Sequence, residues 1–168
     1  VTARLLSGYG FSRAQSPYGF GLGLGIGIAT TFGLYVGVLG LYHFGTTRHV
    51  TAPSPPDSEV TRETRLRTNF ALADVGYTLA LGRVGLRPVF GVGAARFRAQ
   101  ACYQPCDPTY VYDPIWTWRT ALSPGVTATY ALGAHARVGV EARGLWVPWA
   151  SLPTPFAPAA YGVCEVAF

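Results

Sequence analysis

The chain has 168 residues, a mean hydropathy of +0.24 and a net charge of +5 that comes from arginine, since lysine is absent. Only 12% of its residues are charged, against roughly a quarter in a typical soluble domain, so an ordinary water-exposed surface is disfavoured. The arginines are scattered along the chain, which argues against a nucleic-acid-binding patch. Frequent glycines between residues 18 and 44 argue against a membrane-spanning helix there.

The clearest local pattern is the run YGFGLGLGIGIA at residues 18–29. Large apolar residues alternate with glycines, so one face of an extended strand is apolar and the other nearly bare. The alternation continues over eleven residues, and a tilted strand needs about 9–11 residues to cross a bilayer. The run therefore predicts a strand long enough to span a membrane.

The same period recurs along the chain and predicts eight strands, of which the first has the weakest pattern. They are expected at about 2–11, 18–29, 33–44, 66–81, 84–98, 116–131, 135–147 and 158–168. Longer links and links of two or three residues alternate strictly, which is typical of bacterial membrane barrels with short periplasmic turns and longer extracellular loops. The sequence thus predicts one all-β domain over residues 1–168, an eight-stranded antiparallel up-and-down transmembrane β-barrel. A soluble, lipocalin-like barrel with an apolar interior is the competing fold.

In a membrane barrel the apolar face of each strand points to lipid, so Leu24, Val92 and Val140 should point outward while Arg87 and Glu141 point inward. Aromatic residues should collect at both membrane interfaces. The predicted girdles consist of Tyr42, Phe44, Trp116, Trp118 and Trp146 near the loops, and of Tyr77, Tyr130 and Phe168 near the turns.

The opposite face collects charged residues that a narrow barrel must pair, because an eight-stranded lumen holds little beyond its own side chains. We expect a polar lumen with an ion-pair network that contains more arginines than carboxylates and is completed by hydroxyls and water. The network is expected to be formed by Arg4, Asp74, Arg87, Arg119, Arg137, Glu141, Arg143 and Glu165. The bare glycine face of 18–28 should make room for bulky neighbours such as Tyr35 or Phe70. The alternative is that this space holds an acyl chain or another apolar ligand.

The chain ends in YGVCEVAF, with a terminal aromatic residue. Together with eight strands, asymmetric loops and girdles, this ending resembles the small outer-membrane barrel superfamily, which includes the OmpA transmembrane domain, OmpX and OmpW-type proteins. The resemblance implies a bacterial outer-membrane location after export with a signal peptide that this chain lacks. It implies contact with outer-membrane lipids and lipopolysaccharide, and recognition of Phe168 by the barrel-assembly machinery.

Three cysteines call for separate interpretation. Cys102 and Cys106 lie close together in the predicted loop 99–115, and outside the cytoplasm such a pair predicts a disulfide. Metal binding there is the weaker alternative because no histidine is nearby in sequence. Cys164 is expected to be an inert lone thiol. No metal or cofactor is assigned.

Three classes of function are compatible with such a barrel. A lipid A-modifying enzyme would need an activated nucleophile near one rim, and His43, His49, Ser54, Asp57, Ser58 and Glu59 offer the residue types. The segment containing most of them reads more simply as a proline-rich exposed loop, so no catalytic residue is assigned. A narrow, porin-like channel or an OmpW-like carrier of small or hydrophobic molecules is the runner-up. We expect a non-enzymatic structural or adhesion scaffold that presents loops 45–65 and 99–115, with Tyr103, Tyr110 and Tyr112 as interaction candidates, alone or within a larger envelope complex.

Overall fold

The computed structural model describes residues 1–11, 18–45, 47–54, 58–103, 115–148 and 156–168, with side chains described outside 47–65 and 99–117. Its elements are strands throughout: β1 (Thr2–Gly10), β2 (Gly19–Ala29), β3 (Leu34–His43), β4 (Thr47–Ser54), β5 (Ser58–Tyr77), β6 (Leu79–Leu81), β7 (Val84–Tyr103), β8 (Ile115–Ala131), β9 (Ala136–Trp146) and β10 (Phe156–Ala167). Over these residues no helix has the length and apolar character to cross a bilayer.

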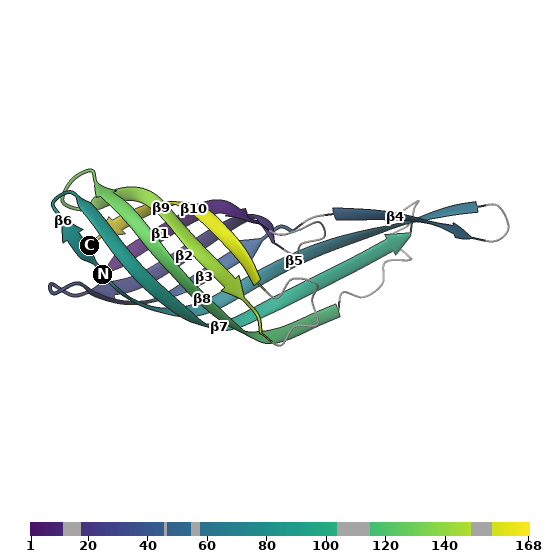
Figure 1. Cartoon of the computed structure of the whole chain (residues 1–168), viewed down its shortest axis with the longest axis horizontal. Coiled ribbons are helices and arrows are strands. Elements are labelled where there is room, and N and C mark those ends of the chain that lie inside the picture. The colour runs from purple at the N-terminus through teal and green to yellow at the C-terminus, as the bar shows by residue number, and fades with distance from the viewer. Residues whose placement is uncertain (12–17, 46, 55–57, 104–114, 149–155) are drawn as a thin grey trace.

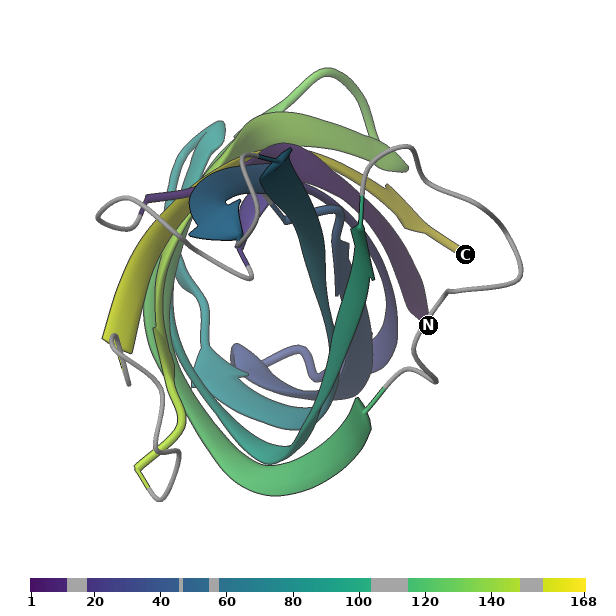
Figure 2. The same cartoon turned by 90° about the vertical axis from the view of Figure 1, so that its right-hand side faces the viewer.

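The strands form a closed, antiparallel, up-and-down barrel (Figures 1 and 2). Each barrel strand pairs with its neighbour in sequence, β5 pairs with β7, and β1 closes the ring against β10 from Thr2↔Ala167 to Gly10↔Ala159. The short β6 continues the register of β5 against β7 after an interruption at Thr78, so both belong to one barrel strand. The predicted eight-stranded barrel is confirmed.

The two faces of the wall point as the alternation predicts. Leu24, Val92 and Val140 are 68%, 47% and 64% exposed on the outside, whereas Arg87 and Glu141 are 3% and 1% exposed inside. An apolar outer face around enclosed charges is the arrangement of a barrel whose solvent is lipid. The lipocalin-like alternative, with its apolar face inside, is wrong.

The short connections lie at one end of the barrel, together with both chain ends (Figure 1). Two of these turns contain a glycine with positive φ, Gly33 at 98° and Gly82 at 64°, a conformation that other residues adopt at a steric cost. The amide of Thr78 donates a hydrogen bond of 2.7 Å to the carbonyl of Gly33, which ties the first turn to the barrel strand beside it.

The prediction that residues 45–65 form a long loop is wrong, because most of these residues belong to strands. Residues of β4 pair with the first half of β5 from Thr47↔Arg65 to Ser54↔Ser58, and β7 stays paired with β5 as far as Arg62↔Tyr103. Figure 1 shows β4, β5 and β7 running past the end of the barrel opposite the chain termini. The stretch is rich in threonine and valine, which favour strands. It lacks an apolar face and has prolines at positions 53, 55 and 56, and this composition favoured a loop.

Candidate functional site: a filled lumen and an external sheet

At the centre of the lumen, two arginines and two carboxylates from three strands form one ion-pair cluster. Nη2 of Arg4 on β1 lies 2.9 Å from Oδ2 of Asp74 on β5, and its Nη1 lies 3.1 Å from Oε2 of Glu141 on β9. Arg143 on β9 contacts the same two carboxylates, Asp74 at 2.6 Å and Glu141 through its Nε. These four side chains are fully buried. Each charge therefore has two opposite partners, as enclosed ions require.

Two hydroxyl groups add hydrogen bonds to this cluster, in which Nε of Arg4 is buried without a hydrogen-bond partner. Thr127 on β8 donates to Oε2 of Glu141 at 2.6 Å, and the Arg143 guanidinium donates to the hydroxyl of Ser123 at 3.4 Å. Both hydroxyl residues are buried. The cluster is thus held by β1, β5, β8 and β9 together, and it ties opposite parts of the wall to each other.

A second ion pair lies nearer the turns. Arg87 on β7 donates from both terminal nitrogens to the Glu165 carboxylate on β10, at 2.9 and 3.1 Å, and from Nε to the Thr78 hydroxyl at 2.9 Å. The ring of Tyr35 links this pair to the central cluster, because the guanidinium carbons of Arg4 and Arg87 lie 4.8 and 4.4 Å from its centroid. Tyr35 is fully buried and makes a cation–π contact with each arginine.

The glycine face of β2 provides the space that these side chains occupy. A Cβ atom built at Gly27 would lie 2.6 Å from the Tyr35 ring, and one at Gly23 would lie 2.5 Å from Leu41. At Gly21 the nearest atoms belong to His43, at 2.9 Å. The expected role of the glycines, making room for bulky neighbours, is confirmed for Tyr35. The neighbours of this face are side chains of the barrel itself.

The half of the lumen nearer the loops is apolar, so the expectation of a polar lumen throughout is wrong. Its buried cluster consists of Leu6, Tyr18, Leu39, Leu41, Phe70, Leu72, Ala95, Ala121, Leu145, Val147, Ala157, Ala159, Tyr161 and Val163. A narrow barrel filled by its own side chains can bury hydrocarbon inside as well as outside. The inward parity of Leu39 and Leu41, shared with Tyr35, was the signal in the sequence.

His43 and Tyr161 form a hydrogen-bonded pair within this apolar layer. Nδ1 of His43 lies 3.2 Å from the carbonyl of Gly19, and its Nε2 lies 2.9 Å from the Tyr161 hydroxyl. A proton on Nδ1 donates to the carbonyl, which leaves Nε2 to accept from the tyrosine. Both ring nitrogens are thus occupied and the side chain is fully buried, so His43 has the surroundings of a structural histidine.

Two of the predicted network residues lie apart from the clusters. Arg119 is exposed and donates to the backbone of Trp118, so its placement in the network is wrong. The reason is geometric: β9 pairs with β8 only as far as Leu122↔Trp146, so Arg119 lies past the last paired residue on that side. Arg137 is half-buried near the turns, and within the described residues it shares no ion pair with a carboxylate.

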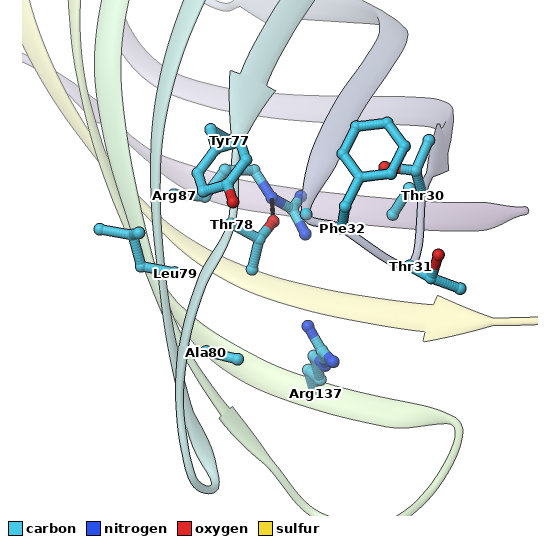
Figure 3. A pocket seen from close by; sticks show the side chains of 11 residues that line it. Thr30, Thr31, Phe32, Tyr77, Thr78, Leu79, Ala80, Arg87 and Arg137 are labelled. Atoms are coloured by element: carbon cyan, nitrogen blue, oxygen red, sulfur yellow. Dashed lines mark hydrogen bonds between the residues drawn. The ribbon is translucent and has the colours of Figure 1, made fainter.

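Arg137 lines a pocket of about 370 Å³ at the turn-side mouth of the barrel (Figure 3). Arg87 and Thr78 line its inner part, while Thr31 and Phe32 belong to the turn between β2 and β3. Among the side chains that the structure describes, four arginines, Arg4, Arg87, Arg137 and Arg143, thus accompany three carboxylates in the lumen. The surplus positive charge lies at Arg137, near this opening, where water can solvate it.

The aromatic residues predicted for the girdles lie on the outer face wherever their side chains are described. Trp118, Trp146 and Phe44 are exposed near the loops, and Tyr77, Tyr130 and Phe168 near the turns; Tyr42 is half-buried against Phe44, at 4.8 Å between ring centroids. The side chain of Trp116 lies outside the described residues. Further exposed aromatics that the sequence analysis did not assign are Tyr9, Phe11, Phe20, Phe32, Phe90 and Phe156.

Several predicted sites fall outside the described side chains and stay predictions. They are the disulfide between Cys102 and Cys106, which receives no support here, the interaction candidates Tyr103, Tyr110 and Tyr112, and the enzyme candidates His49, Ser54, Asp57, Ser58 and Glu59. The backbone of Tyr103 belongs to β7, so the predicted loop 99–115 is wrong as a loop over its first five residues. Cys164 is exposed on the outer face as a free thiol. Over the residues that are described, His, Cys, Asp and Glu form no group that could hold a metal ion.

Outside the barrel, β4 and the outer parts of β5 and β7 form a three-stranded antiparallel sheet. In the part of the chain that the structure describes, β4 pairs with β5 alone, so the other edge of β4 is open. An open edge presents backbone donors and acceptors to a partner strand. We call these three segments the external sheet.

No protein-family model and no curated protein sequence matches the chain. Several solved structures share its fold. Neisserial surface protein A matches with a TM-score of 0.64 at 15% identity, over 99% of this chain and 95% of that chain. A major outer membrane protein from Thermus thermophilus matches with a TM-score of 0.58 at 16% identity, over 98% of both chains.

The N-terminal β-barrel domain of Pseudomonas aeruginosa OprF matches with a TM-score of 0.57 at 14% identity, over 99% of this chain and 97% of that domain. The outer membrane enzyme PagL also matches, with a TM-score of 0.51 at 13% identity over the whole of both chains. The chain therefore has the fold of the small eight-stranded outer-membrane β-barrels. Because these proteins include an enzyme, the fold by itself does not decide the function.

Proposed function

We propose that this protein is a non-enzymatic barrel of the bacterial outer membrane that acts as an interaction or adhesion scaffold through the external sheet. The observation that carries the proposal is that β4, β5 and β7 project beyond the barrel as paired strands (Figure 1). A paired sheet presents a binding surface with less loss of conformational entropy than a loop of the same length. The open edge of β4 adds a route for strand addition.

The filled lumen supports a scaffold over a channel. The buried ion clusters and the apolar layer occupy successive levels of a barrel of eight strands, whereas aqueous pores need many more strands. The name of one fold neighbour, the attachment invasion locus protein Ail from Yersinia pestis, refers to attachment. That neighbour is 9% identical, with a TM-score of 0.50.

Outer-membrane lipids and lipopolysaccharide are the proposed surroundings, with loops outward and turns toward the periplasm. The exposed, outward aromatics at both ends support this placement. Phe168 is 82% exposed at the turn-side end of the closing strand pair, so it is accessible to the barrel-assembly machinery. Protein partners at the external sheet, alone or in a larger envelope complex, complete the proposal.

The test is deletion of the external hairpin. Residues 47–64 would be replaced by a short glycine-serine linker, and the variant expressed on non-adherent cells and scored for adherence to immobilised matrix glycoproteins. We expect adherence of the unaltered protein and its loss in the deletion. The control replaces only residues 55–57 with glycine and serine, which keeps the paired strands. Heat-modified migration on gels verifies that each barrel is folded, and undiminished adherence of a folded deletion variant would refute the proposal.

A further inference from the structure

Three arginines gather on the outer face of the barrel near its loop end. Arg67 on β5 lies directly opposite Arg98 on β7 in the strand register, and Arg96 lies opposite Asn69 one step nearer the membrane centre. Their sequence neighbours Thr68 and Ala95 are buried in the lumen, so the three arginines alternate to the outside. Three arginines therefore occupy neighbouring positions on the outer face of two paired strands.

The arginines lie at the level of the loop-side aromatic girdle. Tyr42 is opposite Asn69, Arg96 is opposite Trp118, and the Arg96 guanidinium lies 5.3 Å from the centroid of the Trp118 ring. Girdle aromatics mark the headgroup region of a bilayer. On β1, β2, β9 and β10 the exposed residues near the loop end are aromatic instead: Tyr9, Phe20, Trp146 and Phe156. Among the described residues, the accessible positive charge near the loop end therefore lies on one sector of three adjacent barrel strands, with Arg67, Arg96 and Arg98 on β5 and β7 and Arg119 on β8.

A groove in the apolar wall begins directly beneath these arginines. Gly40, Ala71 and Ala94 lie opposite one another across β3, β5 and β7, two residues along the strands from Asn69 and Arg96. This offset corresponds to about 7 Å along a strand. Larger side chains border these small residues, which leaves a groove with a volume of about 850 Å³. The groove is also lined by Leu24, Ile26, Val38, Leu72, Ala73 and Val92. Its outward walls face the acyl chains of the bilayer.

We propose that this sector is a binding site for a phosphorylated glycolipid of the lipopolysaccharide class. Arg67, Arg96 and Arg98 contact its phosphates, and one acyl chain occupies the groove between β2 and β7. Guanidinium groups bind phosphate through paired, charge-assisted hydrogen bonds, and three of them match a headgroup with more than one phosphate. The proposal goes beyond the adhesion function and rests on the proposed orientation, with the loop end in the external leaflet.

The headgroup contacts are tested by titrating lipid A into the full chain in zwitterionic micelles, followed by tryptophan fluorescence and by mass spectrometry of the intact complexes. We expect saturable binding that weakens at least about tenfold in the double variant Arg67→Gln/Arg98→Gln, because two charge-assisted contacts are lost. Arg83→Gln removes an exposed arginine at the opposite end of the barrel and should leave the affinity unchanged. Dephosphorylated lipid A should bind the unaltered protein weakly, with about the affinity that phosphorylated lipid A has for the double variant.

The acyl-chain contact is tested by filling the groove. Ala71→Phe places a large side chain in the groove and should weaken lipid A binding, while Ala142→Phe, an exposed outward position on β9 away from it, should not. Equal binding of phosphorylated and dephosphorylated lipid A would overturn the proposal, as would equal losses in Arg83→Gln and the double variant. Phosphatidylglycerol binding as tightly as lipid A would contradict the assignment to a glycolipid. Because the assay uses purified protein, failure of the adherence experiment would leave these outcomes unaffected.

Discussion

Single buried charges in this protein depend on partners from several strands. Glu141 accepts hydrogen bonds from Arg4, Arg143 and Thr127, which come from β1, β9 and β8. Removing one carboxylate therefore leaves two guanidiniums dependent on Asp74 alone. The cost of such a change is dominated by the charge left behind in a dry interior, rather than by the contacts that disappear.

Glu141→Ala should consequently lower the free energy of unfolding by about 3 kcal/mol. The measurement is reversible unfolding in detergent micelles, followed by tryptophan fluorescence. Arg83→Gln, at an exposed turn, provides the control and should change stability by less than about 0.5 kcal/mol. Equal stabilities of the Glu141→Ala protein and the unaltered protein would show that the cluster contributes little.

At this scale, strand parity predicted which charged residues face the lumen, because side chains alternate between two faces regardless of tertiary detail. Parity did not predict which arginine pairs with which carboxylate, since that depends on the register between strands distant in sequence. Arg119 illustrates the limit. Its position in the alternation of β8 is that of a lumen-facing residue, but the pairing of β9 with β8 ends before Arg119 and does not enclose it.

Strand β2 shows how one element shapes the lumen through the side chains it lacks. Gly27 faces the buried Tyr35 ring, which has arginines on both sides and little freedom to move. Gly40 on β3 faces outward, and a Cβ there would meet nothing nearer than 3.8 Å. The two glycines therefore provide a matched comparison between the inner and outer faces.

Gly27→Ala should destabilise the barrel by about 1–3 kcal/mol because the added methyl group overpacks the lumen against Tyr35. Gly40→Ala should stay within about 0.5 kcal/mol of the unaltered protein. Both are measured by the same unfolding experiment. A larger loss for Gly40→Ala than for Gly27→Ala would contradict the role assigned to the glycine face.

The elements that cross the bilayer were predictable, whereas those outside it were not. Membrane-spanning strands carry an apolar face that the alternation reveals. The external strands β4 and the outer half of β5 have polar residues on both faces, and they are stabilised by pairing with each other, which a single sequence does not display. Pro55 and Pro56 in the sequence favoured the interpretation as a loop.

At the scale of the whole molecule, two layers of side chains close the lumen, an ionic layer and an apolar layer. Opening one layer leaves the other in place. This arrangement favours the proposed scaffold over a gated channel, in which rearrangement of one set of ion pairs would suffice to admit ions.

Neither the unaltered protein nor the double variant Asp74→Ala/Glu141→Ala should therefore produce stable openings in planar bilayers. In the variant, Leu39, Leu41 and Phe70 still fill the loop-side half of the lumen. Insertion is verified by heat-modified migration of protein recovered from the same vesicles. Reproducible openings of the unaltered protein would favour the narrow channel or carrier over the scaffold.

At the scale of the fold, length, strand count and the alternation of short and longer links predicted a closed barrel, and the solved neighbours share that fold at identities of 13 to 16%. Such low identities are understandable physically. A barrel wall requires only that residue types alternate, so many sequences satisfy it. The apolar half of the lumen was missed because β3 has apolar residues on both faces, and only the parity of Leu39 and Leu41 marks them as enclosed.

The spacing of the enclosed charges along the chain also has a consequence for how the protein enters the bilayer. Arg87 and Glu165 are 78 residues apart, and Arg4 and Glu141 are 137 apart. A hairpin that contained only one member of such a pair would bring a bare ion into hydrocarbon, at a cost of several kcal/mol. Insertion hairpin by hairpin is thereby penalised, and the route that avoids the penalty assembles the strands around their shared interior as they cross.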